Sequence, residues 1–371
     1  MKKIALILNN PNSVSEVFIH ELFRSLSKNY EISIYYFENV KVNNPLLSQL
    51  KTKKIHSYKS LKFLIFFIRK IILLLTTDLK IKDIYFLFIL SQIKSTKIYI
   101  PFISMLRDFK NVLAYTKSEI YTSIRGTDIT ITPIINSSVI EDYKLIYKHL
   151  KGIHYLSEEL KEMAHNYDLF HSNEHVIYQS IDYNIINFKN KLPTDKLRMI
   201  SVGRLHYVKG FEFLLKIANK LNEEHVDFEL NIVGSGNEYE YLVFLRDLYE
   251  LNDRVNFLGQ QNKIMIKEIL SNHNIYLHTH KVNGLSNTML EALFSGLSLV
   301  VFDSNLDSYN IPDFQNKFIE VPKFDIDKTV KVLKRLYLEK SYGNKEDDLI
   351  GLKKYFDLSE NIKKYNIYFE S

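Results

Sequence analysis

Short apolar runs alternate along the chain with longer segments in which apolar residues recur every three or four positions. The runs are Ile4–Leu8, Ile32–Phe37, Ile98–Ile100, Ile120–Ile124, Met199–Val202, Phe228–Val233, Val255–Leu258, Ile275–Leu277 and Leu297–Phe302. Runs of this length, rich in β-branched and aromatic residues, predict buried strands, and the three-to-four spacing predicts amphipathic helices. Their alternation predicts an α/β fold of parallel sheets covered by helices.

The length of the chain and one polar segment predict two domains. A chain of 371 residues is too long for one ordinary core and fits two. The segment 187–199 is polar, carries one of only seven prolines and precedes a new strand–helix series. We therefore expect a first domain over 1–190 and a second over 191–354. The segment 355–371 is expected to form a helix that packs back on the first domain.

The composition places the protein in a broad class. With 46% hydrophobic and 25% charged residues it resembles soluble globular proteins rather than disordered ones. It contains no cysteine, which excludes disulfides and thiolate metal sites and is compatible with a reducing compartment. The only apolar run near the start, Ile4 to Leu8, is too short for the apolar core of a signal peptide. The sequence therefore predicts a cytoplasmic protein.

A basic block in the first half adjoins a strongly apolar segment. No acidic residue lies between Asn39 and Thr77, and the same stretch contains eight basic residues: Lys41, Lys51, Lys53, Lys54, Lys59, Lys62, Arg69 and Lys70. The apolar run 63–75 is split by two of these and is shorter than the ~20 residues that cross a bilayer. Two interpretations remain: an interfacial helix on an anionic membrane surface through residues 51–75, or a core helix with a solvated basic flank. No nucleic-acid motif accompanies the block, so nucleic acid is not an expected partner.

Two basic residues follow the first predicted strand of the second half. Ligands of open parallel sheets bind at the carboxyl ends of strands. The strand 199–202 ends at Gly203, Arg204 follows directly, and Lys209 lies where the next helix begins. Two cations beside helix amides predict a phosphate or diphosphate site. The alternative is that both are ordinary surface charges.

A second loop combines a glycine, a helix cap and a carboxylate. Gly284 lets a ligand approach the backbone closely, and Ser286 or Asn287 caps the helix, so that its first amides remain available. Glu291, one turn later, can accept two hydrogen bonds from a vicinal diol such as a ribose. A Glu near a helix start is more often only a favourable dipole partner. Cations, amides and a diol acceptor together indicate a sugar nucleotide.

Other candidate motifs are incomplete. The loop 231–242 contains Gly234 and Gly236 but lacks the third glycine of a dinucleotide fingerprint, which argues against an NAD-dependent dehydrogenase. We expect these glycines to form a tight turn that a ligand or the other domain approaches. The Asp-x-Asp of 324–327 has no matching strand context. His278 and His280 alternate along a strand without an acidic or Cys neighbour, so no metal site is predicted.

Four segments together carry a family resemblance. VGRLHYVKG (202–210), LNIVGSGNEYEYL (230–242), VNFLG (255–259) and NGLSNTMLEALFSGLSLVVFD (283–303) resemble the second domain of glycosyltransferase family 4, retaining enzymes with the GT-B fold. In the first half the resemblance is thinner. The segment 13–26, SVSEVFIHELFRSL, resembles the first loop and helix of members that build bacterial exopolysaccharide and lipopolysaccharide. The segment 123–130, SIRGTDIT, resembles an acceptor-facing segment with a His-Gly-x-Asp motif. The segment 177–188, IYQSIDYNIINF, resembles the strand and turn before the linker.

The resemblance implies an architecture and a set of site residues. It implies two Rossmann-like parallel-sheet domains facing across a cleft, the first binding an acceptor and the second a nucleotide-sugar. The catalytic residues would be Arg204 and Lys209, which hold the donor diphosphate, and Glu291, which holds the ribose. Residues 257–261 would border the base. The remaining donor-binding residues would be Gly203, Asn283, Gly284, Leu285, Ser286 and Asn287, and the acceptor-side residues would be Arg125, Gly126 and Asp128. No metal and no cofactor are implied, because cations and helix dipoles stabilise the leaving group.

Two positions depart from the family pattern. Asn283 stands where a second Glu usually contacts the donor sugar, and an Asn can hydrogen-bond sugar hydroxyls but carries no charge. Arg125 stands where the acceptor motif usually has His, and its charge suits an anionic acceptor such as a lipid-linked pyrophosphate sugar.

The sequence therefore predicts a metal-independent, retaining glycosyltransferase. We expect it to move a sugar from a UDP- or GDP-linked donor to a growing, lipid-linked precursor of a bacterial surface polysaccharide. We expect it to act in the cytoplasm, peripherally attached to the inner face of the cell membrane. The alternative is a non-catalytic sugar-nucleotide-binding or scaffold subunit of a glycan-assembly complex, in which Asn283 marks lost chemistry.

Overall fold

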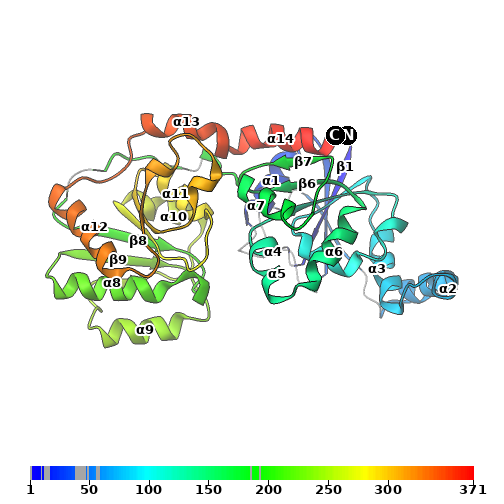
Figure 1. The fold of residues 1–371 in the computed structure, drawn as a ribbon, viewed down its shortest axis with the longest axis horizontal. Coiled ribbons are helices and arrows are strands. Elements are labelled where there is room, and N and C mark those ends of the chain that lie inside the picture. Colours follow the sequence, from blue (N-terminus) through cyan, green and yellow to red (C-terminus); the bar gives the residue numbers. More distant parts are fainter. Residues whose placement is uncertain are drawn as a thin grey trace. The chain divides into compact units, whose positions relative to one another are not determined.

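The protein divides into two compact units in a computed structural model (Figure 1). The structure describes residues 2–9, 11, 17–37, 47, 50–55, 59–183, 186–191 and 194–371. Unit 1 comprises Met1–Ser180 and Leu358–Ser371, and unit 2 comprises Ile181–Asp357. The first crossing therefore lies earlier than the expected boundary at residue 190. The two crossing points are adjacent, because the Ile181 amide donates to the Phe356 carbonyl (2.8 Å).

Unit 1 is built on a seven-stranded, all-parallel sheet in the order β3-β2-β1-β4-β5-β6-β7. Its strands are β1 (Lys3–Leu8), β2 (Glu31–Tyr36), β3 (Lys51–Lys54), β4 (Lys97–Ile100), β5 (Glu119–Ile124), β6 (Leu150–Tyr155) and β7 (Glu174–Val176). The central β1 is buried on both faces, as expected of a parallel strand covered by helices. Edge strands β3 and β7 have no fully buried residue, so the apolar pattern did not predict them.

Helices cover both faces of this sheet and divide its core into two clusters. They are α1 (Val17–Leu26), α2 (Leu61–Thr76), α3 (Ile81–Ser91), α4 (Thr127–Thr130), α5 (Thr132–Ile135), α6 (Ser138–Tyr147), α7 (Glu158–His165) and α14 (Leu358–Glu370). Ile4 and Leu6 of β1 pack with α1 and α14. Ala5 and Ile7 point to the other face and pack with α3 and α6, because side chains alternate along a strand.

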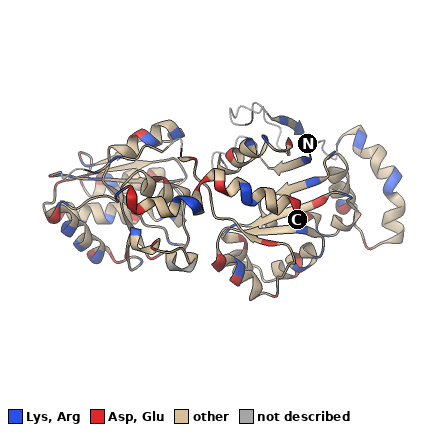
Figure 2. Ribbon diagram, turned by 90° about the horizontal axis from the view of Figure 1, so that it is seen from above, with Lys and Arg blue, Asp and Glu red and all other residues tan. Residues whose placement is uncertain are grey.

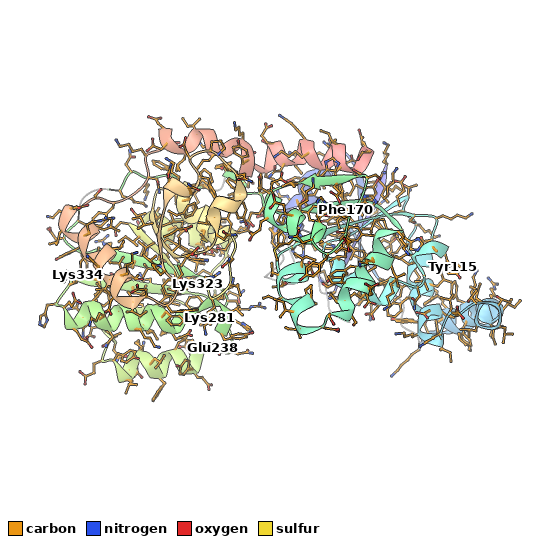
Figure 3. All side chains as sticks on the ribbon, in the orientation of Figure 1. Tyr115, Phe170, Glu238, Lys281, Lys323 and Lys334 are labelled. Atoms are coloured by element: carbon orange, nitrogen blue, oxygen red, sulfur yellow. The ribbon has the colours of Figure 1, made fainter. Side chains whose placement is uncertain are left out.

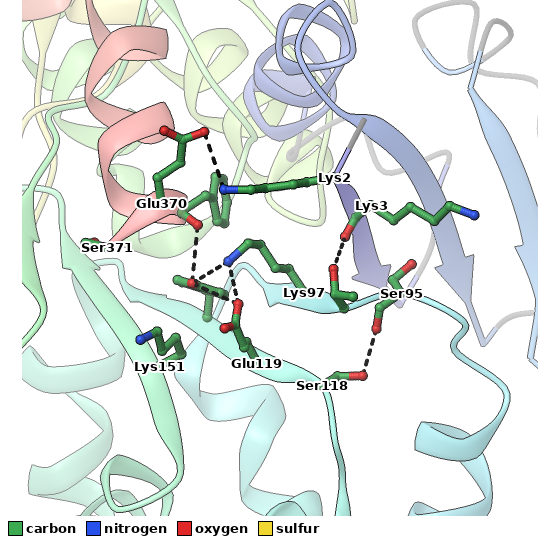
Figure 4. A network of polar contacts seen from close by, with 12 residues as sticks. Lys2, Lys3, Ser95, Lys97, Ser118, Glu119, Lys151, Glu370 and Ser371 are labelled. Atoms are coloured by element: carbon green, nitrogen blue, oxygen red, sulfur yellow. Dashed lines mark hydrogen bonds and ion pairs between the residues drawn. The ribbon is translucent and has the colours of Figure 1, made fainter.

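The helix α14 is anchored in unit 1 by aromatic residues. Tyr368 and Phe369 are fully buried, and the Tyr368 hydroxyl lies 2.9 Å from both the Thr122 and the Gly152 carbonyls. A Cβ at Gly152 would lie 2.9 Å from the Tyr368 ring, so the absence of a side chain there admits the helix. Close by, Lys97 is ion-paired with Glu119 beneath the end of α14 (Figure 4).

Unit 2 contains a six-stranded parallel sheet in the order β10-β9-β8-β11-β12-β13. Its strands are β8 (Leu197–Val202), β9 (Phe228–Val233), β10 (Val255–Phe257), β11 (Ile275–His278), β12 (Ser298–Phe302) and β13 (Phe318–Val321). The sequence predicts all of these except β13. The strand order reverses between β8 and β11, and ligands of open α/β sheets bind at such a switch point.

The helices of unit 2 are α8 (Phe211–Glu223), α9 (Tyr239–Leu248), α10 (Lys263–Ser271), α11 (Asn287–Phe294), α12 (Ile326–Glu339) and α13 (Asp347–Phe356). Leu214 and Leu215 of α8 and Leu333 of α12 pack with Met199 of β8 in one buried cluster. In α8 the same cluster includes Leu214, Ile217 and Leu221, whose spacing of three to four residues places them on one face of the helix. The fold thus fixes the positions of the loops that follow β8 and β11.

Candidate functional site

The loop after β8 is held tightly by the loop after β9. The Gly203 amide donates to the Val233 carbonyl (2.9 Å), which continues the strand pairing by one residue. A Cβ at Gly234 would lie 1.8 Å from the Gly203 carbonyl oxygen, and one at Gly236 would lie 2.1 Å from that of Leu205. These glycines therefore permit the close approach of another loop of the same unit, rather than serving the ligand approach expected from the sequence.

Lys209 lies at the carboxyl end of β8, at the entry to α8. Burial and, after it, the positive charge of Arg204 lower the pKa of Lys209 to about 8. Arg204 itself is exposed. Next to Lys209, a Cβ at Gly210 would lie 2.1 Å from the Thr279 carbonyl oxygen, which shows how closely the start of α8 lies on the end of β11. The structure thus brings the two predicted phosphate-binding cations together at the switch point.

Two histidines lie near Lys209. His278, the last residue of β11, and His280 have ring centroids 3.5 Å apart. Burial lowers the pKa of both imidazoles, and so does the positive charge of Lys209, after the effect of His278 in the case of His280, so both are neutral at physiological pH. Within the described chain, His278 Nε2 has no hydrogen-bond partner. The sequence shows these histidines on one side of a strand, but their proximity to Lys209 depends on the pairing of β8 with β11.

The loop before α11 presents an open glycine and a capped helix. Gly284 has a φ of +117°, and no heavy atom lies within 4 Å of where its Cβ would be, so a ligand can reach the backbone there. The amide of Gly284 donates to the Ser304 carbonyl (3.1 Å) and that of Leu285 to the Tyr309 hydroxyl (3.2 Å). Two of the amides expected to bind the donor are therefore used to hold the loop.

The first turn of α11 retains the remaining donors. Ser286 Oγ accepts a hydrogen bond from the Met289 amide (3.2 Å), which makes Ser286 the N-cap. The amides of Asn287 and Thr288 are the first two of the helix and have no intrahelical acceptor. These amides and the positive end of the helix dipole together favour an anionic group.

Tyr276, a residue that the sequence reasoning missed, links β11 to β8 and α11. Its hydroxyl lies 3.2 Å from the Val202 carbonyl and 2.7 Å from Thr288 Oγ1. Burial and, among the neighbouring charges, the Glu291 carboxylate raise its pKa, which places Glu291 beside this hydroxyl. The only sequence signal was a hydroxyl-bearing aromatic residue in the middle of an otherwise aliphatic buried run.

Two lysines that were not predicted also reach this edge of unit 2 (Figure 3). Lys281, just beyond β11, is ion-paired with Glu212 of α8 at 2.6 Å. Lys323, just beyond β13, donates a hydrogen bond to Asn283 Oδ1. Each follows a strand end by a few residues, which is a weak signal because many surface lysines do the same.

The residues expected to border the base lie on the neighbouring loop after β10. The Gly234 amide donates to the Gly259 carbonyl (2.8 Å), and Ser235 Oγ lies 3.2 Å from Gln260 Oε1. In the described part of the chain, a surface hollow of about 480 Å³ lies away from these loops, between α8 and α12 near Glu224 and Lys334. We assign the candidate site to the strand-end loops because their cations and helix amides can bind a diphosphate, an arrangement that the hollow lacks.

The predicted acceptor-side residues form one cluster in unit 1. Arg125 Nε donates to Ser123 Oγ (2.8 Å) and to the Pro101 carbonyl (3.1 Å), and its guanidinium lies 4.8 Å from the centre of the Phe18 ring. Asp128 Oδ2 accepts from the Arg125 amide (3.2 Å), and burial raises the pKa of Asp128. Between them Gly126 has a φ of +68° and open space where a side chain would be.

The side chain of Arg125 also meets α14. Its Nη2 lies 3.3 Å from the Tyr99 hydroxyl, and that hydroxyl lies 2.9 Å from His154 Nε2. Tyr365 of α14 is hydrogen-bonded to the same imidazole nitrogen (3.3 Å). Burial, followed by the charge of Arg125, lowers the pKa of His154. The helix that returns to unit 1 therefore supports the cluster from behind.

Comparisons with known proteins match the second unit to one family. Residues 182–361 match the family described as glycosyl transferases group 1. An uncharacterized glycosyltransferase of Haemophilus influenzae is 35% identical over 129 residues, or 32% of this chain and 36% of that protein. The putative glycosyltransferase EpsF of Bacillus subtilis is 33% identical over 116 residues, or 30% of this chain and 29% of that protein. The chain thus matches about a third of the length of these relatives.

Solved structures match the fold over the whole chain. HepE of Anabaena in complex with UDP-glucose has a TM-score of 0.77 at 12% identity, covering 100% of both chains. Sucrose-phosphate synthase of Thermosynechococcus elongatus has a TM-score of 0.76 at 12% identity, covering 100% of this chain and 98% of that one. At such low identity the likeness shows the fold, which is GT-B with two Rossmann-like parallel-sheet units. Unit 2 of this GT-B chain is thus similar to the glycosyl transferases group 1 family.

Proposed function

We propose that this protein is a retaining glycosyltransferase of the family 4 type that takes a sugar from a UDP- or GDP-linked donor. The observation that carries the proposal is the proximity of Arg204 to a half-buried Lys209 at the switch point of unit 2. Among the described ion pairs, neither cation has a carboxylate partner. Two unneutralised cations beside the first amides of α11 suit the diphosphate of a nucleotide-sugar.

The reaction breaks the bond between the sugar C1 and the oxygen of the donor diphosphate. Negative charge develops on that oxygen as the nucleotide leaves, and Arg204 and Lys209 stabilise it. An oxygen of the acceptor forms the new bond to C1, and its proton passes to the leaving diphosphate oxygen. Lys209 has a lowered pKa in the free protein, and a nearby phosphate favours its charged form. In this proposal Glu291 holds the ribose and no metal is needed.

Support for a nucleotide-sugar donor comes from both the site and the comparisons. HepE, which shares the fold, was solved with UDP-glucose. The named relatives include the phosphatidylinositol N-acetylglucosaminyltransferase gpi3 subunit of Schizosaccharomyces pombe, which is 22% identical over 177 residues, or 47% of this chain and 39% of that protein. The acceptor that we propose is a lipid-linked precursor of a bacterial surface polysaccharide.

The helix α2 supports a membrane location for that acceptor. None of its residues is buried, which argues against the core-helix interpretation. Phe63 and Phe66 pack on Phe88 of α3, and the rest of the helix exposes large apolar side chains. These are Leu61, Leu64, Ile65, Ile68, Ile71, Ile72 and Leu75, which we call the α2 patch. Monomers rarely expose so continuous an apolar surface unless it binds something.

Charge complements the α2 patch. The helix carries Lys62, Arg69 and Lys70 and no acidic residue (Figure 2), and Lys51, Lys53 and Lys54 of β3 are exposed. In the described part of the chain, no helix is long and apolar enough to cross a membrane. Apolar side chains flanked by basic ones bind the interface of an anionic bilayer. We propose peripheral attachment to the inner face of the cell membrane through residues 51–75.

A second candidate function is a non-catalytic sugar-nucleotide-binding subunit of a glycan-assembly complex. The observation that favours it is Asn283, which stands in place of a carboxylate and is hydrogen-bonded to Lys323. In that case the protein binds nucleotides but transfers nothing.

One experiment separates the two functions. Purified protein is mixed with a panel of UDP- and GDP-linked sugars in the presence of a chelator, and both donor hydrolysis and transfer to a lipid extract are measured. Turnover that disappears in Lys209→Ala and persists in Lys331→Ala supports the enzyme. Nucleotide binding without turnover for any donor supports the subunit. Absence of nucleotide binding contradicts both.

A further inference from the structure

The carboxyl edge of the unit 2 sheet carries more positive charge than a diphosphate requires. Arg204 and Lys209 follow β8, Lys281 follows β11 and Lys323 follows β13. Only Lys281 has an acidic partner, Glu212, among the ion pairs described for these four. The proposed function assigns Arg204 and Lys209 to the diphosphate. Lys323 remains to be explained.

No described carboxylate on these loops is ion-paired with Lys323. Asp303, after β12, accepts the Asn305 amide at 3.1 Å. Asp325 accepts the Lys328 amide at 2.8 Å and caps α12. In the described residues, Lys323 Nζ donates a hydrogen bond to the amide oxygen of Asn283. An amide oxygen accepts a hydrogen bond without cancelling the charge, so the ammonium keeps its charge and has two more N–H donors.

The backbone around Lys323 holds it in place. The next residue, Phe324, has a φ of +67°, a conformation that a bulky residue adopts only when its surroundings require it. Its ring packs against Phe213 of α8 (5.0 Å between centroids) and Phe302 at the end of β12 (6.0 Å). Lys323 itself is half-buried. This arrangement holds the backbone of Lys323, and the hydrogen bond to Asn283 brings its ammonium beside the loop that precedes α11.

The partner of Lys323 adjoins the most open backbone of the candidate site. Asn283 directly precedes Gly284, where no atom lies within 4 Å of an added Cβ. The Asn283–Lys323 pair therefore lies next to backbone that a ligand can reach. A Glu or Asp at position 283 would neutralise the lysine and repel an anion, whereas the neutral Asn283 orients the lysine and leaves its charge available.

We infer that Lys323, oriented by Asn283, binds a carboxylate on the sugar of the donor, so that the donor is a nucleotide-linked uronic acid. This inference rests on the proposed function, because it places the diphosphate on Arg204 and Lys209. The substrate then carries three anionic groups, two phosphates and one sugar carboxylate, and the site supplies a separate cation for the third. Asn283 and Lys323 act together as specificity-determining residues.

The test compares donors that differ only in that carboxylate. Dissociation constants are measured by calorimetry for UDP, GDP, UDP-glucose, UDP-glucuronate, GDP-mannose and GDP-mannuronate. The wild type is expected to bind one of the uronates about tenfold more tightly than the matching hexose, the effect of one hydrogen bond between charged groups. Lys323→Gln removes this preference and leaves the affinity for the nucleoside diphosphate unchanged. Asn283→Asp, which neutralises the lysine, also reduces the preference, and Lys331→Gln on α12 serves as the control.

The outcomes distinguish this inference from the function on which it rests. If neither UDP nor GDP binds, the proposed function fails and the inference fails with it. If UDP or GDP binds but the uronates show no preference over the hexoses, the uronate inference is overturned and the function stands. Equal weakening of UDP and uronate binding by Lys323→Gln also overturns it, because Lys323 is then a phosphate ligand. Thermal unfolding of each variant confirms that the fold is retained.

Discussion

The Tyr276 hydroxyl lies 2.7 Å from Thr288 Oγ1, which joins a buried strand to the first turn of α11. The same hydroxyl lies 3.2 Å from the Val202 carbonyl at the end of β8. One side chain therefore couples the loop that carries Arg204 to the helix that carries Glu291. The geometry of the candidate site depends on this side chain although it is buried.

Replacing Tyr276 by Phe is expected to weaken both the fold and the site. The change leaves the Thr288 hydroxyl and the Val202 carbonyl without this partner, at a cost of about 1–3 kcal/mol in the free energy of unfolding. Nucleoside diphosphate affinity is expected to fall as well, since α11 is no longer fixed to β8. Urea unfolding and calorimetry measure the two effects. Tyr241→Phe on the exposed surface of α9 is the control. An unchanged affinity in Tyr276→Phe would show that the link does not position the site.

Nucleotide binding is expected to depend on pH through Lys209. Its pKa is lowered from 10.5 to about 8, so the free lysine loses its proton as the pH rises through 8. A bound phosphate favours the protonated form, and binding above pH 8 must therefore take up a proton. As far as Lys209 is concerned, the nucleotide affinity is expected to be independent of pH below pH 8 and to fall as the pH rises above 8. Calorimetry across this range measures the effect. Lys209→Arg, which stays charged, is expected to abolish the decline, and persistence of the decline would assign it to another group.

Gly234 tests the contact between the two strand-end loops of unit 2. An alanine Cβ there would lie 1.8 Å from the Gly203 carbonyl oxygen, and the residue has a φ of +142°. We expect Gly234→Ala to reduce the free energy of unfolding by about 1–3 kcal/mol, the usual cost of a strained backbone, or more. Gly351 in α13 has open space around its Cβ position. Gly351→Ala is expected to stabilise the protein by up to about 1 kcal/mol. Thermal unfolding compares the two, and equal effects would contradict the geometry.

The α2 patch is expected to bind anionic vesicles. Ile68, Ile72 and Leu75 are 61%, 65% and 81% exposed. Changing all three to Ser removes about 2 kcal/mol or more of apolar transfer free energy per side chain. Cosedimentation with vesicles containing anionic lipid should then be lost. Added salt should weaken the binding of the unchanged protein, because basic residues near the surface contribute about 1 kcal/mol each. Leu338→Ser on α12, at a site 75% exposed, is the control. Equal binding to neutral and anionic vesicles would contradict the role of charge.

Arg125 is expected to act on the acceptor and not on the donor. Arg125→His introduces an imidazole, which can also carry a positive charge, but it loses the Nε contact with Ser123 (2.8 Å) and the fixed planar donor pair of a guanidinium. We expect transfer to a lipid-linked acceptor to fall by about tenfold or more, as for the loss of one charge-assisted hydrogen bond. The dissociation constant for UDP or GDP should stay the same. A parallel loss of nucleotide affinity would show that Arg125 affects the donor instead.

The fold could be predicted largely from apolar periodicity, because central parallel strands are buried on both faces. The edge strand β3, with the sequence KTKK and four exposed residues, has no apolar signal to detect. β13 was also missed, since its four-residue sequence FIEV is interrupted by the exposed Glu320. The segment 13–16, part of the resemblance in the first half, lies outside the described residues.

Some residues of the candidate site could likewise be predicted from the sequence, and others could not. Arg204, Lys209 and Gly284 could be predicted because each lies in a loop between a strand and the next helix, and strand ends share one edge of a parallel sheet. Lys323 could not, because its position depends on β13 lying beyond β12 and on a loop that returns to Asn283. The glycines of the loop after β9 were assigned to ligand approach, since sequence does not show which backbone comes close. The two interpretations of α2, an interfacial helix or a core helix, differed only in whether the helix is buried. Burial depends on tertiary packing.

The chain leaves unit 1 before Ile181 and returns to it after Asp357, at adjacent points joined by the hydrogen bond between Ile181 and Phe356. This connection determines the order in which the two units are completed during synthesis. Unit 2 is inserted in unit 1, since Leu358–Ser371 belongs with Met1–Ser180. The ribosome therefore completes all of unit 2 before it releases α14. Until then Tyr99 and Tyr121 lack the aromatic residues of α14 that cover them, and the β1 face that packs with α1 is incomplete. Unit 2 can fold during synthesis, whereas unit 1 can close only after unit 2 has emerged.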